Sequence, residues 1–155
     1  MGNPRKYPPQ ETLSRLRHWC DRQERCHQEV RFKAIEWGYY NDDVEELITE
    51  LIEGNYLNEE RFARAYVSGK LRIKKWGRKK IIQELKQKKI SDYCINKGME
   101  EIDDVEYLAI LTHWIDRKNH QWKSLKSFQR NGKIAQFCIN KGFEAELVWE
   151  VLKEK

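Results

Sequence analysis

The pattern of apolar residues repeats along the chain, and this repetition limits the possible folds more than any other feature of the sequence. A shift of 104 residues aligns Val30 with Ile134, and seven further pairs match apolar residue with apolar residue or glycine with glycine. A shift of about 51 residues aligns Ile81 with Val30 in the same way. Such a period predicts tandem units of about fifty residues, in which each unit packs mainly on its neighbours.

Three helices are predicted in the first unit, at roughly 12–22, 26–37 and 41–53, because apolar residues recur there at three- and four-residue steps. Gly38 suits the end of the second helix, and Asn41 suits the start of the third. The predicted fold is therefore all-α: an elongated tandem array of three three-helix repeats, resembling helix-turn-helix units, over 12–55, 56–101 and 102–155. We expect residues 1–11, which contain three prolines and the cations Arg5 and Lys6, to form a disordered basic lead.

The second unit begins with a helix capped by Asn58. The apolar stripe predicted along this helix consists of Phe62, Ala65, Tyr66, Gly69 and Ile73. The pair Trp76 and Gly77 interrupts the pattern, and a second helix follows from about residue 78. In the third unit a helix is predicted from about residue 103, whereas the helical content of 117–133 stays open.

Charge is concentrated in the second unit. Residues 70–89 contain ten basic residues and one acid, which gives a local charge of +9, and because the whole chain carries +5 the remaining residues sum to −4. A local positive field of this kind favours phosphate as the partner, and cations on both sides of a turn favour contacts that do not depend on base sequence. The predicted DNA-binding residues are Lys70, Arg72, Lys74, Lys75, Arg78, Lys79 and Lys80. Two roles fit Trp76: stacking on a base, or packing against the repeat.

Enzymatic motifs are missing from the sequence. It contains no P-loop, no dinucleotide-binding glycine motif, no Gly-x-Ser-x-Gly elbow and no His-Glu-x-x-His pattern. We therefore expect no catalytic residues, no enzyme activity and no cofactor. No apolar run is long enough to cross a membrane, and the first ten residues lack the apolar segment of a signal peptide, so a cytoplasmic location is expected.

One cluster has the residue types that bind metals. It consists of His18, Cys20, Cys26 and His27, but it lacks the paired C-x-x-C spacing of structural zinc sites. We therefore expect free thiols and no metal.

The second unit also carries a longer signature, which begins at Gly54 with GNYLNEERFARAYV and continues with KWGRKKI from Lys75 and QELK from Gln83. This signature resembles the centre of the RecX family of regulators of the RecA recombinase. Asn58 and Trp76 stand where family members more often have Asp and Gly, but they keep the character of a cap and a turn.

The resemblance implies a protein that binds the RecA–DNA filament, inhibits recombinase and coprotease activities, and thereby modulates DNA repair, homologous recombination and the SOS response. It also implies a RecA-binding surface that includes Glu60, Arg61 and Arg64, although Phe62 between them suits the core and the two arginines could instead pair with Glu59 and Glu60. The expected partners are the RecA filament and DNA, single-stranded or duplex, bound weakly and without sequence preference by a monomer.

A second hypothesis belongs to another class: a helix-turn-helix transcriptional regulator that recognises duplex DNA in the major groove. This hypothesis predicts a dimer and a discrete footprint. The helix at 78–89 offers mostly lysine, whereas base recognition usually needs Asn, Gln, Ser or Arg, so the sequence favours phosphate contacts. A structural adaptor without a nucleic-acid partner would leave the +9 segment unexplained.

Overall fold

The computed structural model describes residues 4–154, and over that range the chain forms helices and no β-strand. The prediction of an all-α fold is confirmed. No helix among these residues combines the length and the apolar character that a membrane span requires. The helices are α1 (Pro9–Arg22), α2 (His27–Glu36), α3 (Asp42–Glu53), α4 (Glu59–Arg72), α5 (Arg78–Gln87), α6 (Asp92–Met99), α7 (Asp104–Gln121), α8 (Ser127–Asn140) and α9 (Ala145–Lys153).

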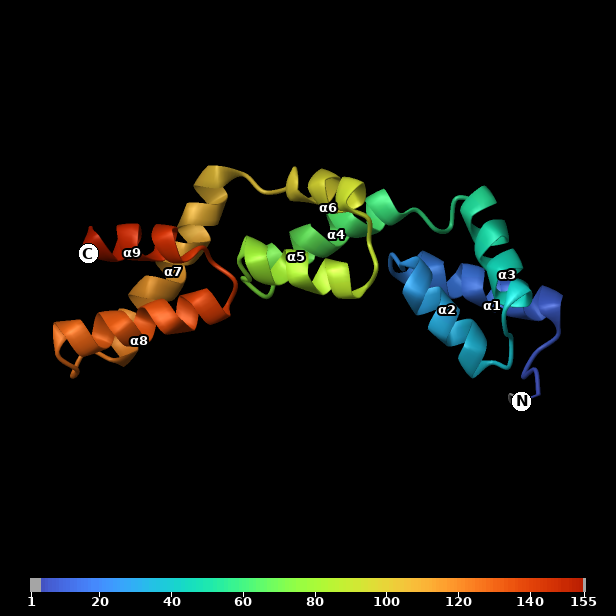
Figure 1. The fold of residues 1–155 in the computed structure, drawn as a ribbon, viewed down its shortest axis with the longest axis horizontal. Helices are drawn as coiled ribbons and strands as arrows, with labels where there is room; N and C mark the ends of the chain where they lie inside the picture. The colour runs from blue at the N-terminus through green and yellow to red at the C-terminus, as the bar shows by residue number, and fades with distance from the viewer. Residues whose placement is uncertain (1–3, 155) are drawn as a thin grey trace.

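The helices form an elongated row of three groups, α1–α3, α4–α6 and α7–α9, with the two chain ends at opposite ends of the row (Figure 1). The tandem array of three-helix repeats is therefore confirmed. The stretch 117–133, left open by the sequence, is helical except between Trp122 and Lys126, where α7 has ended and α8 has not yet begun.

Several aligned positions of the repeat have the same environment in the groups that they join. Val30, Ile81 and Ile134 are completely buried in α2, α5 and α8, the middle helices of the three groups. The glycines Gly38 and Gly142, which follow α2 and α8, both have a positive φ angle, 90° and 103°. Equivalent residues thus perform equivalent packing and chain-reversal roles, as the repeat predicts.

The buried apolar side chains form two clusters within the described part of the chain. One lies among α1, α2 and α3 and includes Leu57, whereas the other extends from α4 to α9 and also takes in Cys26. The second and third groups therefore share one core. Between the first and second groups the contacts are also polar: the His27 N–H donates to Glu59 Oε2 over 3.0 Å, and Lys88 pairs with Glu29 at 3.4 Å.

The prediction of a disordered lead is wrong for residues 4–11, and residues 1–3 lie outside the described residues. Helix α1 already begins at Pro9, a residue whose fixed φ suits the first turn of a helix. The Lys6 N–H donates to the Trp37 carbonyl over 2.9 Å, and the buried Tyr39 hydroxyl donates to the Tyr7 carbonyl over 2.7 Å. Residues 5–7 are ordered because residues that follow α2 offer them polar partners, which sequence composition does not show.

The apolar stripe predicted along α4 is not the face that packs in the core: of its residues only Phe62 is buried, and Tyr66 is partly buried against the core. The side chains of α4 that are buried are Phe62, Ala63, Val67 and Leu71, whereas Ile73, next after the helix, is 80% exposed. The reason is the position of α6, whose Gly98 approaches the Ala63 carbonyl so closely that a Cβ atom would lie 3.0 Å from its oxygen. Helix α4 has two adjacent apolar faces, and α6 covers only one of them.

Candidate nucleic-acid interface

The basic turn between α4 and α5 is attached to the turn between α8 and α9. The Gly77 N–H donates to the Lys141 carbonyl over 2.8 Å, and the Lys79 N–H donates to the Gly142 carbonyl over 2.9 Å. These two bonds bring the lysines at the start of α5 beside Lys141 of the third group. The candidate site therefore spans two repeats, although the sequence placed it in one.

Two of the predicted DNA-binding residues form ion pairs at this junction. Arg72 Nε lies 2.9 Å from Glu106 Oε2, and the Arg78 guanidinium lies 2.7 Å from Asp104 Oδ1. Arg78 also contacts Glu144 at 3.1 Å. Each of these bonds connects the second group to the third, so the geometry gives both arginines a role in joining repeats, and their contact with DNA stays a prediction.

Tyr107 completes the network around Arg78. Its hydroxyl accepts the Arg78 backbone N–H over 2.9 Å and donates to the Glu144 carboxylate. Burial, together with the bond to Glu144, raises the pKa of Tyr107. Burial opposes ionisation of Glu144, but the bonds from Tyr107 and Arg78 outweigh it and lower the pKa of this carboxyl group. At neutral pH the network therefore contains a neutral phenol, a carboxylate and a guanidinium. The negative charge of Glu144 is paired with Arg78 within the protein.

The other predicted cations take part in none of the ion pairs described between residues 4 and 154. The ammonium groups of Lys70 and Lys80 lie 5.0 and 4.5 Å from the centre of the Trp76 ring, which is partly buried against the core. Of the two roles that fit Trp76, the structure shows packing. Lys74 and Lys79 are exposed, and Lys75 has a left-handed backbone whose carbonyl accepts the Trp114 indole N–H over 2.8 Å.

The third group contributes lysines that sequence reasoning missed. Their ammonium groups lie over half-buried aromatic rings, which restricts where the charges can be: Lys118 over Phe137 at 4.2 Å, Lys133 over Trp122 at 4.6 Å and Lys141 over Trp114 at 5.1 Å. The sequence contains several basic residues between 117 and 133, but their positions on the molecule depend on where α7 ends and α8 begins.

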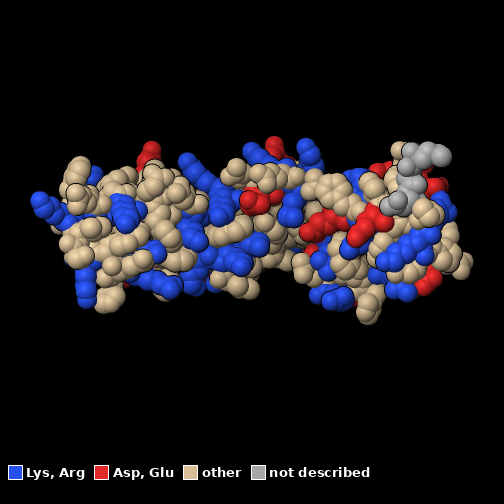
Figure 2. Space-filling view, turned by 90° about the horizontal axis from the view of Figure 1, so that it is seen from below, with Lys and Arg blue, Asp and Glu red and all other residues tan. Residues whose placement is uncertain are grey.

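We define the basic face as Lys79, Lys80, Lys118, Lys133 and Lys141. Figure 2, which views the molecule from the side of α5 and α8 in Figure 1, shows basic side chains gathered over the middle of the molecule and extending toward the C-terminal group, whereas acidic side chains are most frequent over the N-terminal group. Four of these five lysines lie over aromatic rings, and lysines gathered on one face can contact phosphates of a nucleic acid without reading its bases.

The residues that the family resemblance assigned to RecA binding have partners within the chain. Arg61 pairs with Glu24, just after α1, and its guanidinium also donates to the Asn55 carbonyl over 3.0 Å. Arg64 is similarly shared among three carboxylates, at 3.3 Å from Glu60 and at 3.1 Å from each of Glu100 and Glu101. These contacts hold α4 to its neighbours, and the RecA-binding role of Glu60, Arg61 and Arg64 stays a prediction.

The cysteine and histidine cluster is divided between the two cores. Cys20 packs in the first apolar cluster and Cys26 in the second, and burial raises the pKa of each thiol to about 11. Both are therefore protonated at neutral pH. Residues 4–154 contain no group of three or more His, Cys, Asp or Glu side chains arranged to hold a metal ion.

Comparisons with known proteins agree with this architecture. The family descriptions "RecX, second three-helix domain" and "RecX, third three-helix domain" match residues 58–99 and 104–152, together more than half of the chain. A crystal structure of RecX from Lactobacillus salivarius superimposes with a TM-score of 0.83 at 20% sequence identity, over 94% of this chain and 95% of that one. Another regulatory protein RecX superimposes with a TM-score of 0.85 at 20% identity, over 95% of this chain and 73% of that one.

Two curated relatives are similar in sequence. Regulatory protein RecX of Lactobacillus johnsonii is 34% identical over an alignment of 95 residues, and the match covers 55% of this chain and 35% of the relative. Regulatory protein RecX of Lactobacillus gasseri is 30% identical over 113 residues, which are 73% of this chain and 42% of the relative. The match thus spans less than half the length of either relative. The two family matches, on helices that form the predicted repeats, lead to one conclusion: the chain belongs to the RecX family.

Proposed function

We propose that this protein binds the RecA–DNA filament in the cytoplasm and inhibits the recombinase and coprotease activities of RecA, and so modulates DNA repair, homologous recombination and the SOS response. The observation that carries the proposal is the basic face, a row of lysines that extends over two repeats joined by one core. The family's regulatory role supplies the recombinase as the partner.

The geometry of the chain supports a filament as the target. An elongated array exposes a long surface relative to its mass, and several weak contacts along such a surface add to one another when the target is itself repetitive. The basic face would contact phosphates of single-stranded or duplex DNA, while the acidic N-terminal group would contact protein. A monomer is sufficient for this arrangement.

A helix-turn-helix regulator of transcription is the second candidate, because each group contains three short helices. The helix that would enter the major groove in the second group is α5, and its first turn contains Arg78, Lys79 and Lys80. Arg78 is held by Asp104 and Glu144. The lysines that remain suit phosphates better than base edges.

Strand exchange by the cognate RecA, together with RecA-stimulated cleavage of a repressor, tests the proposal. We expect the protein to inhibit both reactions and to bind DNA of unrelated sequences with similar affinity. A discrete footprint on one duplex sequence, without any effect on the two RecA reactions, would contradict the proposal and favour the transcriptional regulator.

A further inference from the structure

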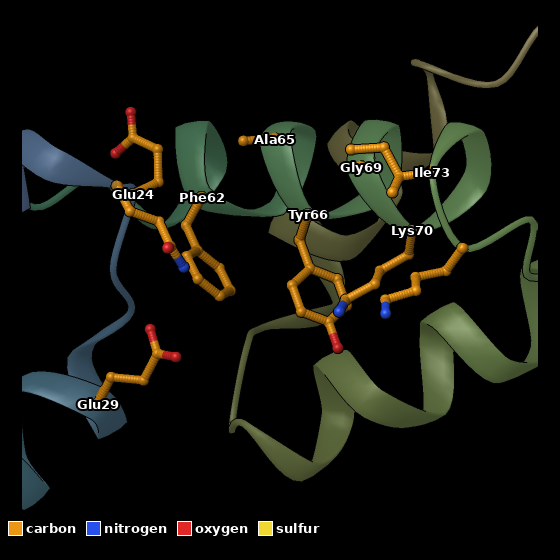
Figure 3. Close-up of a pocket in the computed structure, with 10 residues that line it drawn as sticks. Glu24, Glu29, Phe62, Ala65, Tyr66, Gly69, Lys70 and Ile73 are labelled. Carbon is orange, nitrogen blue, oxygen red and sulfur yellow. The ribbon is translucent and has the colours of Figure 1, made fainter.

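The outer face of α4 forms the floor of an open groove that no element of the described chain covers. The groove has a volume of about 420 Å³, and its apolar lining consists of Phe62, Ala65, Tyr66, Gly69 and Ile73 (Figure 3). These are the residues of the stripe that the sequence predicted for α4. Phe62 is buried and Tyr66 is partly buried against the core, so the accessible part of this face is formed by Ala65, Gly69 and Ile73.

At Gly69 the floor of the groove carries no side chain. A Cβ atom added at Gly69 would meet no other atom within 4 Å, so the groove is open directly above this residue. From Phe62 to Ile73 the lining extends over about 16 Å at the rise of an α-helix, which equals the length of about three helical turns. A groove of these dimensions and apolar character fits one amphipathic helix.

The two ends of the groove differ in charge (Figure 3). Glu24 and Glu29 lie at one end and Lys70 at the other. Lys74, four residues after Lys70, also lines the groove. The glutamates are already paired with Arg61 and Lys88, whereas Lys70 and Lys74 take part in none of the ion pairs described within residues 4–154. The basic end therefore favours a carboxylate from a ligand, while the glutamates and the apolar floor disfavour a nucleic-acid backbone.

We propose that this groove binds an amphipathic helical segment of the recombinase subunit, with its apolar side chains on Ala65, Gly69 and Ile73 and an acidic side chain near Lys70 and Lys74. The identity of this partner rests on the proposed function. The groove and the basic face would then separate two tasks, since one surface binds protein and the other binds nucleic acid.

Substitution of Gly69 by leucine puts a side chain into the groove at a position where its Cβ atom meets nothing within 4 Å, and Gly132→Leu is a matched control. Gly132 is also inside a helix, α8, and a Cβ atom there also meets nothing within 4 Å. Binding of the full chain would be measured against RecA filaments assembled on single-stranded DNA, and separately against the same DNA without RecA. We expect Gly69→Leu to weaken filament binding at least about tenfold and to leave binding to DNA alone unchanged, while Gly132→Leu changes neither.

A second variant, Ile73→Glu, distinguishes a lost binding surface from a folding defect. Ile73 is 80% exposed, so its substitution should not disturb the fold. It should weaken filament binding as well, with an unchanged circular dichroism melt. If the wild-type chain binds filaments and both variants bind equally well, the groove is not the docking site, and the proposed function still stands. If the wild-type chain does not bind filaments, the proposed function and this inference both fail. A wild-type dimer in sedimentation that Gly69→Leu converts to a monomer would assign the groove to a second copy and overturn the inference.

Discussion

Gly77 and Gly142 are in backbone contact, and neither position has room for a Cβ atom. A Cβ at Gly77 would lie 2.3 Å from the Gly142 carbonyl carbon, and a Cβ at Gly142 would lie 2.5 Å from the Lys80 Cβ. Gly142 also has a φ of 103°, in the region that favours glycine. This contact fixes the basic turn of the second group on the third, so the basic face depends on two glycines that carry no charge.

Substitution of Gly77 by alanine should therefore destabilise the fold by about 2 kcal/mol or more, because the backbone of the α8–α9 turn must move to admit one methyl group. Urea denaturation followed by circular dichroism measures this free energy of unfolding. Gly69→Ala is the control, since its methyl group enters open space and should stabilise helix α4 by up to about 1 kcal/mol. Equal stability of the two variants would show that the turns do not pack as described.

Glu144 should make the fold sensitive to acid. In the folded chain the pKa of this carboxyl group lies below its ordinary value of 4.5. Burial alone would raise the pKa, but the bonds from Tyr107 and Arg78 outweigh the effect of burial. The associated stability is complete above the unfolded-state pKa and is lost as the pH falls below about 4.5 through the lower folded-state pKa.

Glu144→Gln should consequently be less stable than the wild type at pH 7, and its stability should fall less steeply over that acidic range. Thermal unfolding measured from pH 3 to pH 7 records both effects. Glu146→Gln, an exposed change in the first turn of the same helix, is the control. The same acid dependence in wild type and Glu144→Gln would exclude this network as its source.

Neutralising the basic face should weaken DNA binding in a salt-dependent manner. For the double variant Lys79→Gln and Lys133→Gln, the slope of log affinity against log salt should decrease in magnitude by about 0.7 to 0.9 for each phosphate that the variant no longer neutralises. The control replaces Arg22 and Lys33 of the N-terminal group by glutamine, which removes the same net charge elsewhere. If both doubles bind DNA with the same affinity and slope, binding follows net charge and the basic face has no special role.

Arg78→Gln separates a structural role from a DNA contact. Because Arg78 joins α5 to Asp104 and Glu144, its loss should lower the melting temperature, and the salt slope of DNA binding should remain that of the wild type. A reduced salt slope with an unchanged melting temperature would instead show that Arg78 contacts DNA and does not stabilise the fold.

The N-terminal lead should be released by Tyr39→Phe. The buried Tyr39 hydroxyl donates to the Tyr7 carbonyl and accepts from Thr12 Oγ1 over 3.0 Å. Because Thr12 Oγ1 also lies 3.2 Å from the Tyr7 carbonyl and can donate to it, removal of the Tyr39 hydroxyl should cost about 0.5 to 1.5 kcal/mol. Hydrogen exchange of the Lys6 amide, which donates to the Trp37 carbonyl, should become faster. Tyr93→Phe, on a side chain that is 63% exposed, should change neither quantity.

Much of this architecture could be predicted from the sequence because each repeat carries its own helix limits. Asn58 does cap α4, since its side chain accepts the Arg61 N–H over 2.9 Å, and Gly38 and Gly142 reverse the chain as their alignment predicts. Helix periodicity and capping depend on residues close together in the chain, so they are visible without knowledge of the packing.

The misplaced features all depend on contacts between distant residues. Helix α4 offers two apolar faces, and only the position of Gly98 in α6 decides which one is buried. The ion pairs of Arg78 could not be predicted either, because its partners Asp104 and Glu144 are 26 and 66 residues away; its contact with DNA stays a prediction. The lysines of the third group were not predicted for the same reason. Lys118 and Lys133 belong to different helices and are far from Lys80 in the sequence, so the sequence does not show that the three lysines share a face.

The most direct test of the proposed function is ATP hydrolysis by the cognate RecA on single-stranded DNA, measured while the protein is added at ratios well below one copy per RecA subunit. Regulation of the filament predicts a progressive fall in hydrolysis over that range, with a weaker fall for the Lys79→Gln and Lys133→Gln double variant. Hydrolysis that stays constant up to one copy per subunit would contradict it.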